Sequence, residues 1–421
     1  MPASGYEGVI EIDQRNKSGS KDRAKINGGY LQKQLLDKLF SLIKNGSFTV
    51  RYWDGTESKH GDGPPMFRLI INDKSVVARL VTNPALAFGE GYMDGVLEID
   101  GEIEAMIKLI NMNQAMLKKL TDWKIGRVKL TGTSIKQQKS DISHHYDLGN
   151  EFFARWLDPT MSYSCAYFHS PDDTLEEAQL RKIDYTLKKL QLKPGETMLD
   201  IGSGWGWMII HAAREYGVKS TGITLSQEQF EATRQRLKDM DLEDQAEVLL
   251  MDYRELASSR RKFDKVVSVG MLEHVGQQAL PLFLSSVKNL LKPSGLMLLH
   301  SITHVAERAV NPWIEKYIFP GGYIPSLRKL IWLLPENDLH LQDVECLRMH
   351  YAMTLDRWSE AFEQNLDPII KEYGERFVRM WRFYLQSCAA TFRYSGLSIH
   401  QLLFSRELNN ELPLTRDYLY V

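Results

Sequence analysis

From about His144 onward, the chain alternates apolar runs that resemble strands with helical segments, and this alternation limits the fold more than any other feature. The runs are ETMLDIG, KSTGITLS, EVLLMDY, KVVSVGM and LMLLHSI. Several of them are continuously apolar, which is typical of parallel strands buried on both faces. The pattern therefore predicts an α/β domain with a doubly wound sheet over residues 144–421.

Residues 26–120 show a different pattern, which predicts a small N-terminal α+β domain. The leucines between Tyr30 and Leu42 fit one helix face, and the following segment SFTVRYW alternates as in a strand. The segments MFRLIIN and SVVARLV predict further strands. Residues 100–120 have the apolar spacing of an amphipathic helix that closes this domain.

Two polar segments flank the predicted N-terminal domain. Residues 1–25 are rich in Ser and Gly, and we expect them to form a flexible arm. Residues 121–143 form a basic linker, which is either a solvated connector or a segment that contacts anionic lipid headgroups. Its basic residues are Lys124, Arg127, Lys129, Lys136 and Lys139.

Composition narrows the class of protein further. A chain of 421 residues exceeds the usual size of one hydrophobic core, and 43% hydrophobic with 25% charged residues is typical of a globular protein. A net charge of -2 does not favour nucleic acid as a partner. Three scattered cysteines predict neither a disulfide framework nor a metal cluster. The N-terminus lacks a signal pattern and no apolar run reaches about 18 residues, so we expect a cytoplasmic protein.

A glycine-rich loop follows the first predicted strand of the α/β domain. It runs from Asp200 through Gly202 and Gly204 to the helical segment WMIIHAAREYG. Glycines allow the backbone to approach a ligand, and a helix N-terminus offers unpaired N–H groups. Because Asp200 suits a cation better than a pyrophosphate, the loop favours S-adenosylmethionine, with a nicotinamide cofactor or a structural turn as alternatives.

Polar residues also follow the second and third predicted strands. Thr224 and Gln229 stand where a ribose-binding group is expected, and Asp252 with Tyr253 offers a carboxylate and a ring for an adenine. Each of these groups could instead serve only as a helix cap or a turn.

Seven motifs in order carry a resemblance over residues 144–406. They are HHYDLGNEFF, LDPTMSYSCAYF, LDIGSGWGW, GITLSQEQ, SVGMLEHVG, NPWIEKYIFPGGYIPS and FVRMWRFYLQSCAATFR. The chain resembles cyclopropane-fatty-acyl-phospholipid synthases and the related mycolic acid cyclopropane synthases. This resemblance implies a Rossmann-like class I methyltransferase domain. The length of the N-terminal domain resembles the phospholipid synthases.

The resemblance also implies site residues. The family's cofactor residues correspond to Tyr163, Ser164, Gly202, Gly204, Thr224 and Gln229. A bicarbonate ion is expected to be held by Cys165, Glu273, His300, the backbone of Ile302, and Tyr351. Ser203 departs from the family, which commonly has cysteine there. Independently, Glu273 and His300 lie at carboxyl ends of predicted parallel strands, where ligands bind.

The expected activity is methyl transfer from S-adenosylmethionine to a cis double bond of phospholipid acyl chains. A cyclopropane ring would close through a carbocation that bound bicarbonate deprotonates. We expect the rings of Tyr317 and Phe319 to stabilise positive charge. The apolar stretch 313–334 is either an acyl-chain channel or a helical cap packed on the sheet. His144, His145 and His274 are interpreted as structural or indirect neighbours of the site.

Three alternatives remain open. The same alkene could yield a methyl-branched or methylene fatty acid, the chain could be a non-catalytic lipid-binding homologue, or it could methylate small molecules or nucleic acid. The expected partner is the phospholipid bilayer, reached as a peripheral protein on the inner face of the membrane. The sequence also allows a homodimer.

Overall fold

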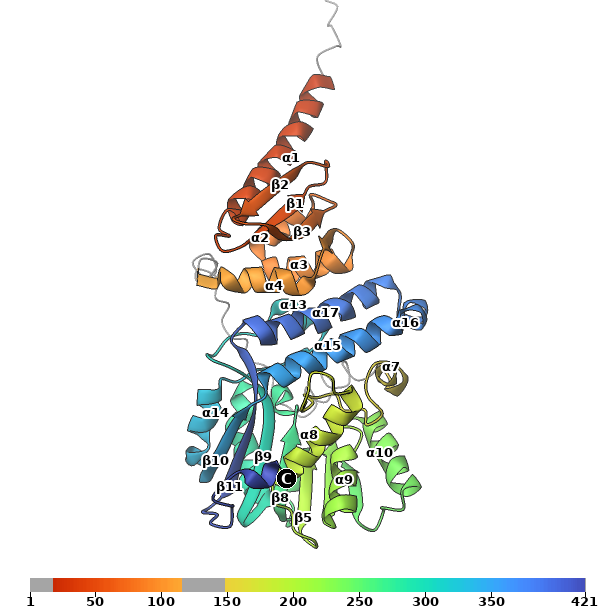
Figure 1. Ribbon diagram of the computed structural model, residues 1–421, viewed down its shortest axis with the longest axis vertical. Coiled ribbons are helices and arrows are strands. Elements are labelled where there is room, and N and C mark those ends of the chain that lie inside the picture. The colour runs from red at the N-terminus through yellow and green to blue at the C-terminus, as the bar shows by residue number, and fades with distance from the viewer. Residues whose placement is uncertain (1–17, 116–147, 421) are drawn as a thin grey trace, which may run out of the picture.

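The computed structural model describes residues 18–115 and 148–420, with side chains from residue 29 onward. A small N-terminal domain stacks on one end of a larger α/β domain, which gives an elongated molecule (Figure 1). The five basic residues of the predicted linker, together with His144 and His145, lie outside the described residues. The predicted division into domains and linker therefore stays a prediction.

The larger domain is built on a seven-stranded sheet with the order β10-β11-β9-β8-β5-β6-β7. All five predicted strands are present and pair in parallel: β5 (Thr197–Ile201), β6 (Lys219–Thr224), β7 (Ala246–Leu250), β8 (Phe263–Val269) and β9 (Leu291–His304). Two further strands that the sequence analysis missed, β10 (Leu339–Cys346) and β11 (Leu397–Arg406), pair antiparallel beside β9. The prediction of a doubly wound α/β domain is confirmed.

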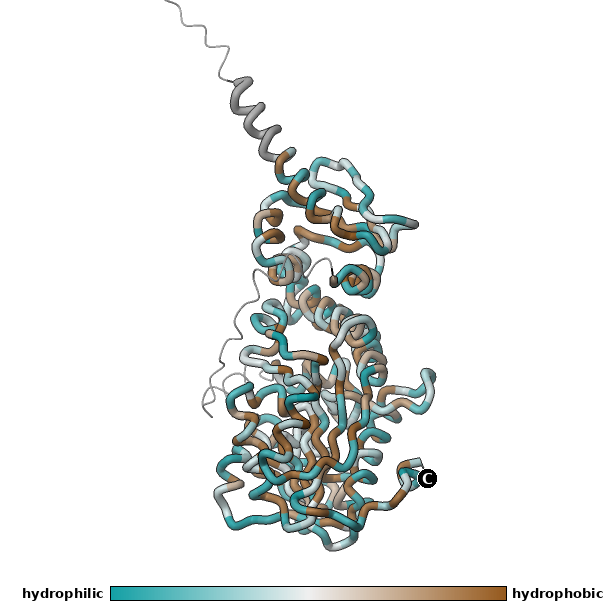
Figure 2. Tube along the Cα trace, turned by 90° about the vertical axis from the view of Figure 1, so that its left-hand side faces the viewer, coloured by the Kyte–Doolittle hydropathy of each residue, from teal (hydrophilic) through white to brown (hydrophobic). Residues whose placement is uncertain are grey.

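Helices cover both faces of this sheet because its strands are apolar on both sides. On β5, Leu199 and Ile201 join one core cluster, while Met198 joins the other. The first cluster holds α11 (Tyr253–Ala257) and α12 (Leu280–Leu290); the second holds α8 (Leu175–Lys189), α9 (Trp207–Tyr216) and α10 (Gln227–Asp239). Figure 2 shows apolar residues concentrated along the strands at the centre of this domain.

Two of these helices begin at residues that cap them. Thr174 and Glu177 form a capping box at the start of α8, and Ser226 accepts a hydrogen bond from the backbone of Gln229 at the start of α10. Short helical segments complete the domain: α7 (Asn150–Ala154), η3 (Leu272–His274), η4 (Gln277–Ala279), η5 (Pro335–Asn337) and η6 (Asp417–Leu419).

Further helices lie beside the sheet and at its end, where α15 and α17 separate it from the N-terminal domain (Figure 1). They are α13 (Pro312–Tyr317), α14 (Leu327–Leu333), α15 (Arg348–Gln364), α16 (Leu366–Tyr373) and α17 (Glu375–Tyr394). The pair α15 and α17 packs around fully buried aromatic side chains, among them Trp358 and Trp381.

The N-terminal domain contains a four-stranded sheet with the order β2-β1-β3-β4. Its strands are β1 (Ser47–Arg51), β2 (Glu57–Gly61), β3 (Pro65–Ile71) and β4 (Leu97–Asp100), and its helices are α1 (Ser18–Phe40), α2 (Val76–Thr82), α3 (Pro84–Met93) and α4 (Ile103–Met112). Helix α1 begins at Ser18, so the last part of the predicted arm is helical. The expected strands at residues 48–52 and 66–72, and the closing helix, are present.

The prediction of a strand for SVVARLV is wrong, because this segment forms α2. The carboxylate of Asp73 accepts a hydrogen bond from the backbone N–H of Ser75, and this turn ends the strand that precedes it. Val76, Val77 and Leu80 are then buried, which is the spacing of a helix face.

The two domains contact each other through α17, which packs on α3 and α4, and through a close approach of α13 to α3. A Cβ atom on Gly89 would lie 2.2 Å from the ring of Trp313, so only glycine lets these helices approach so closely. Beside it, the carboxylate of Glu90 accepts hydrogen bonds from Lys316 (2.7 Å) and from the Tyr317 hydroxyl (3.0 Å).

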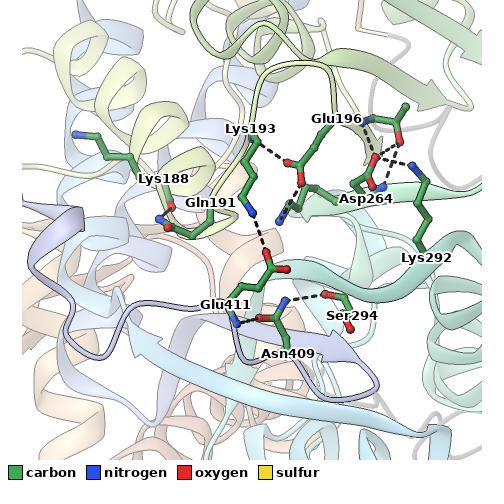
Figure 3. A network of polar contacts seen from close by, with 11 residues as sticks. Lys188, Gln191, Lys193, Glu196, Asp264, Lys292, Ser294, Asn409 and Glu411 are labelled. Carbon is green, nitrogen blue, oxygen red and sulfur yellow. Dashed lines mark hydrogen bonds and ion pairs between the residues drawn. The ribbon is translucent and has the colours of Figure 1, made fainter.

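A polar network ties together the amino ends of the central strands (Figure 3). The carboxylate of Asp264 accepts hydrogen bonds from the backbone of Thr197 at 2.8 Å and from Lys292 at 2.7 Å. Lys193 pairs with Glu411 of the C-terminal segment at 2.7 Å. These contacts hold the amino ends of the strands, whereas ligands in open α/β sheets bind at the opposite, carboxyl ends.

Candidate active site

A first cavity lies at the carboxyl ends of β5, β6, β7 and β8, where ligands bind in open α/β sheets. All nine residues expected to bind the cofactor line it: Tyr163, Ser164, Asp200, Gly202, Gly204, Thr224, Gln229, Asp252 and Tyr253. The structure therefore brings these residues together, although they come from four separate segments of the chain.

The glycine-rich loop has backbone conformations that favour glycine. Gly202, Gly204 and Gly206 have φ angles of 84°, 53° and 87°. A Cβ atom on Gly202 would lie 2.8 Å from the side chain of Met271, whereas one on Gly204 would meet no protein atom within 4 Å. Gly204 therefore presents open backbone to the cavity at the start of α9.

Asp200 provides a buried carboxylate in the wall of this cavity. Burial raises its pKa to about 7, and the positive charge of Lys182 opposes this shift. Burial likewise lowers the pKa of Lys182 to about 8. A cationic ligand beside Asp200 would favour the charged carboxylate, which fits the sulfonium and amino groups of S-adenosylmethionine.

Lys182 is a site residue that the sequence analysis missed. It lies on α8, lines the first cavity and donates a hydrogen bond of 2.8 Å to the hydroxyl of Ser164. On the same helix, the Gln179 amide donates to the carbonyls of Ser162 and Ser164. These two side chains hold the segment that separates the first cavity from a second one.

Two of the predicted cofactor groups are already engaged with protein partners. The hydroxyl of Thr224 donates to the side-chain carbonyl of Gln229 at 2.8 Å. The carboxylate of Asp252 caps α11 and accepts hydrogen bonds from the guanidinium of Arg254. The helix-cap interpretation of Asp252 is thus present in the structure, and its adenine contact stays a prediction.

The second cavity adjoins the first. It is lined by all five residues expected to hold bicarbonate: Cys165, Glu273, His300, Ile302 and Tyr351. Five residues line both cavities: Tyr163, Ser164, Val269, Gly270 and His274. A ligand in the first cavity and one in the second would therefore meet at this shared wall.

Two enclosed polar atoms of the second cavity have no hydrogen-bond partner. One carboxylate oxygen of Glu273 accepts a 2.6 Å hydrogen bond from the backbone N–H of Ile302, but its Oε2 atom has none. The Nε2 atom of His300 also has none. Because such atoms are costly to leave unsatisfied, they indicate a small polar ligand between them.

Burial sets the protonation of the groups around this cavity. It raises the pKa of Glu273, which the hydrogen bond from Ile302 opposes, and it raises the pKa of Tyr351 well above 10. It also holds the pKa of His300 well below 6.5. At neutral pH the cavity therefore offers a phenol O–H and a neutral imidazole to its ligand.

Cys165 is fully buried and its thiol donates to the carbonyl of Ala166 at 3.3 Å. Burial raises the pKa of this thiol, so it stays protonated. Only a thiolate is an effective nucleophile. The S–H of Cys165 is thus engaged with the backbone, and the residue lines the second cavity as a neutral group that is unsuited to covalent catalysis.

The apolar stretch 313–334 has two separate roles. Phe319, Tyr323 and Ile324 line the second cavity, and the expected role of the Phe319 ring in stabilising positive charge stays a prediction. Trp313 and Tyr317 instead form the contact with the N-terminal domain, and the expectation that Tyr317 faces the reacting groups is wrong. His274, for which a structural or indirect role is expected, lines both cavities.

Within residues 18–115 and 148–420, no group of three His, Cys, Asp or Glu side chains is arranged to hold a metal ion. In the same described part of the chain, no helix has the length and apolar character needed to cross a membrane.

The sheet, the glycine loop and the acid at the end of β5 define a class I S-adenosylmethionine-dependent methyltransferase. Coclaurine N-methyltransferase, whose structure contains SAH, shares the fold with a TM-score of 0.60 at 21% identity, over 76% of this chain and 99% of that one. The chain belongs to the mycolic acid cyclopropane synthetase family, whose model matches residues 133–402. A domain of unknown function matches residues 35–121.

Two curated relatives match most of the chain. A probable fatty acid methyltransferase of Pseudomonas putida is 37% identical over 88% of this chain and 95% of its own length. Cyclopropane-fatty-acyl-phospholipid synthase of Escherichia coli K12 is also 37% identical, over 85% and 92%. A mycolic acid cyclopropane synthase complexed with SAH and CTAB is 36% identical with a TM-score of 0.59, over 63% of this chain and 98% of that one.

Proposed function

We propose that this protein transfers the methyl group of S-adenosylmethionine to a cis double bond of unsaturated phospholipid acyl chains. The new methyl carbon then bonds to both alkene carbons and loses one proton, which closes a cyclopropane ring. We propose bicarbonate, held in the second cavity, as the group that takes this proton. The two adjoining cavities carry the proposal, because the second places unpartnered Glu273 and His300 atoms beside the wall of the first.

The residues of the second cavity fit a hydrogencarbonate ion. Such an ion presents acceptor oxygens and one O–H donor. The enclosed Oε2 atom of Glu273 can accept that O–H, while the hydroxyl of Tyr351 can donate to an acceptor oxygen. When bound there, bicarbonate supplies a base at the shared wall. In the first cavity, Asp200 and the open backbone at Gly204 would hold S-adenosylmethionine, which supplies the methyl group.

The remaining lining keeps water away from the reacting carbon atoms. Val310, Ile314, Phe319 and Ile324 give the second cavity an apolar side, which suits an acyl chain. An alkene is a weak nucleophile and a carbocation is captured by water, so exclusion of solvent favours ring closure. The face of Phe319 can stabilise positive charge that develops on the chain.

A methyl-branched product is the second candidate, because the chain is as similar to a probable fatty acid methyltransferase as to a cyclopropane synthase. Both reactions begin with the same methyl transfer. A saturated methyl branch also requires a reductant, since the product gains hydrogen that S-adenosylmethionine does not supply. A non-catalytic homologue is disfavoured, since every expected site residue is retained and lines a cavity.

The product separates these candidates. We would express the chain in a host that lacks cyclopropane lipids and analyse its phospholipid acyl chains by mass spectrometry. A cyclopropane and a methylene fatty acid each add one CH2 to the mass of the acyl chain. Under conditions that hydrogenate double bonds, the methylene product takes up hydrogen and the cyclopropane does not. A saturated methyl branch adds one CH2 and two further hydrogen atoms. Unchanged acyl chains, with S-adenosylmethionine bound by the purified protein, would refute the lipid substrate.

We also propose that the basic linker docks the enzyme on the inner face of the membrane. Each basic residue near an anionic surface contributes about 1 kcal/mol of attraction. Replacing all five linker residues, Lys124, Arg127, Lys129, Lys136 and Lys139, with Gln should therefore weaken cosedimentation with anionic vesicles, most clearly at low salt. The matched control replaces five exposed basic residues of the catalytic domain: Lys219, Arg234, Lys238, Arg260 and Lys371. Equal vesicle binding by both variants would refute the docking role and show that the linker only connects the two domains.

A further inference from the structure

We propose that Gln401 fixes the tautomer of His300, so that the imidazole always presents an Nε2–H donor to the second cavity. Gln401 lies on β11, directly opposite His300 in the antiparallel pair of β11 with β9. Gln401 is 1% exposed, and it lies outside the seven motifs that carry the family resemblance. Gln401 is a positioning residue, because it acts on a ligand only through His300.

Lys189 determines which way the amide of Gln401 points. Its ammonium lies 2.8 Å from the side-chain oxygen of Gln401, and both groups are buried. A lysine ammonium can only donate hydrogen bonds, so it must face the carbonyl oxygen of the amide and not the NH2 group. The NH2 group of Gln401 is thereby directed to the other side.

On that side the NH2 group meets two acceptors. Its nitrogen lies 3.3 Å from the Nδ1 atom of His300 and 3.3 Å from the hydroxyl oxygen of Thr186. An amide NH2 has two hydrogens to donate, one for each contact. Nδ1 of His300 therefore accepts a hydrogen bond, and in a neutral imidazole the proton must then reside on Nε2.

Glu345 and Tyr185 hold Lys189 in place. Its ammonium pairs with the carboxylate of Glu345 and lies 4.7 Å from the centre of the Tyr185 ring. The hydroxyl of Tyr185 donates to the same carboxylate at 3.0 Å. The charge of Lys189 is thus compensated, and the order Glu345, Lys189, Gln401, His300 forms one directed series of hydrogen bonds.

The surroundings of His300 keep the ring neutral, so that only one of its two nitrogen atoms carries a proton. The ring is 1% exposed, and burial, reinforced by the charges of Lys182 and Lys189, holds its pKa well below 6.5. Its Nε2 atom lines the second cavity without a protein partner. A fixed N–H at this point suits an acceptor oxygen of an anion, whereas the opposite tautomer would turn a lone pair toward it.

The role in turnover rests on the proposed function, but the tautomer can be measured without it. We would label the full-length protein with 15N-histidine and record long-range 1H–15N spectra, using His300→Gln to assign the His300 signals. The wild-type protein should show Nε2 protonated and Nδ1 unprotonated. A proton on Nδ1 of wild-type His300 would overturn the proposal, whatever the activity.

The variant Gln401→Glu reverses the direction of one hydrogen bond while keeping the contact with Lys189. A carboxylate can only accept, so it should draw the His300 proton to Nδ1. We expect S-adenosylmethionine affinity to stay unchanged and kcat to fall about 10- to 100-fold, as for a lost hydrogen bond to a charged group. Persistence of a proton on Nε2 in this variant would overturn the proposal.

Ser405→Ala is the matched control, because Ser405 is also a buried polar residue of β11 with side-chain hydrogen bonds. It should retain both the wild-type tautomer and kcat. An equal loss of kcat in both variants would show that any change to a buried polar residue of β11 lowers activity, and it would overturn the proposal. A wild-type Nε2–H signal without any lipid product would instead refute the proposed function and leave the role of Gln401 standing.

Discussion

Replacement of Glu273 with glutamine tests the second cavity while changing only a few atoms. In the wild-type side chain, Oε1 accepts the 2.6 Å hydrogen bond from Ile302 and Oε2 is left for a ligand. A glutamine can keep the bond with Ile302 through its carbonyl oxygen. Its NH2 group would then stand where the second carboxylate oxygen was, so an acceptor becomes a donor.

The size of the effect follows from that exchange. A hydrogen bond that involves a charged group contributes about 1.5–3 kcal/mol, and each 1.36 kcal/mol on a barrier changes a rate about tenfold. Loss of the ligand's bond to Glu273 should therefore lower kcat about 10- to 150-fold. Affinity for S-adenosylmethionine should change little, because Glu273 lines the second cavity and not the first.

Two measurements separate these effects: calorimetry of S-adenosylmethionine binding, and product formation with unsaturated phospholipid vesicles. Glu228→Gln, on the exposed side of α10, provides a control for the same chemical change. Loss of cofactor binding in a folded Glu273→Gln protein would refute our assignment of Glu273. Wild-type turnover would refute the role of the second cavity.

Three further predictions concern the loop, the buried acid and the domain contact. Gly204→Val should weaken S-adenosylmethionine binding more than about tenfold, since a β-branched residue at φ 53° is strained and enters the open cavity; calorimetry showing wild-type affinity would contradict this. Binding should also weaken about tenfold between pH 8 and pH 6, because the pKa of Asp200 is about 7 and its charged form is lost as the pH falls; Asp200→Asn should abolish that dependence. Because folding raises this pKa, Asp200 ionises in the unfolded chain at a lower pH than in the folded one. The ligand-free protein should therefore lose stability as the pH rises from about 4 toward 7. Gly89→Val should lower the free energy of unfolding by about 1–3 kcal/mol through overpacking against Trp313, and an unchanged denaturation midpoint would show that the helices can separate freely.

Local patterns in the sequence were sufficient for the central sheet and the cofactor loop. Parallel strands buried on both faces are rich in apolar residues, several of the five are continuously so, and their alternation with helical segments allowed all five to be found from local patterns. Asp200 and its glycines are contiguous and follow a strand, and the topology then places them at the ligand-binding edge. The five residues expected to hold bicarbonate in the second cavity lie far apart in the sequence, and the family resemblance identified them as a set.

Short segments were less predictable, because their structure depends on contacts elsewhere. The apolar residues of SVVARLV fit either a strand or a helix. The turn at Asp73 ends the preceding strand, and the segment then forms α2. Tyr317 lies in an aromatic motif near the second cavity, yet Glu90 of the other domain binds its hydroxyl. No local pattern contains such a partner.

The sequence by itself determined which class of sheet forms and where its cofactor loop lies, since both depend on periodicity and on adjacent residues. Tertiary structure decided which hydrogen bonds orient the side chains of the second cavity. Gln179, Lys182, Thr186 and Lys189 form a polar stripe on the buried face of α8, which a sequence could have revealed as unusual. Their use depends on β11, which brings Gln401 between Lys189 and His300. Hydrogen bonds between residues more than 100 positions apart are set by packing, and only the folded chain contains them.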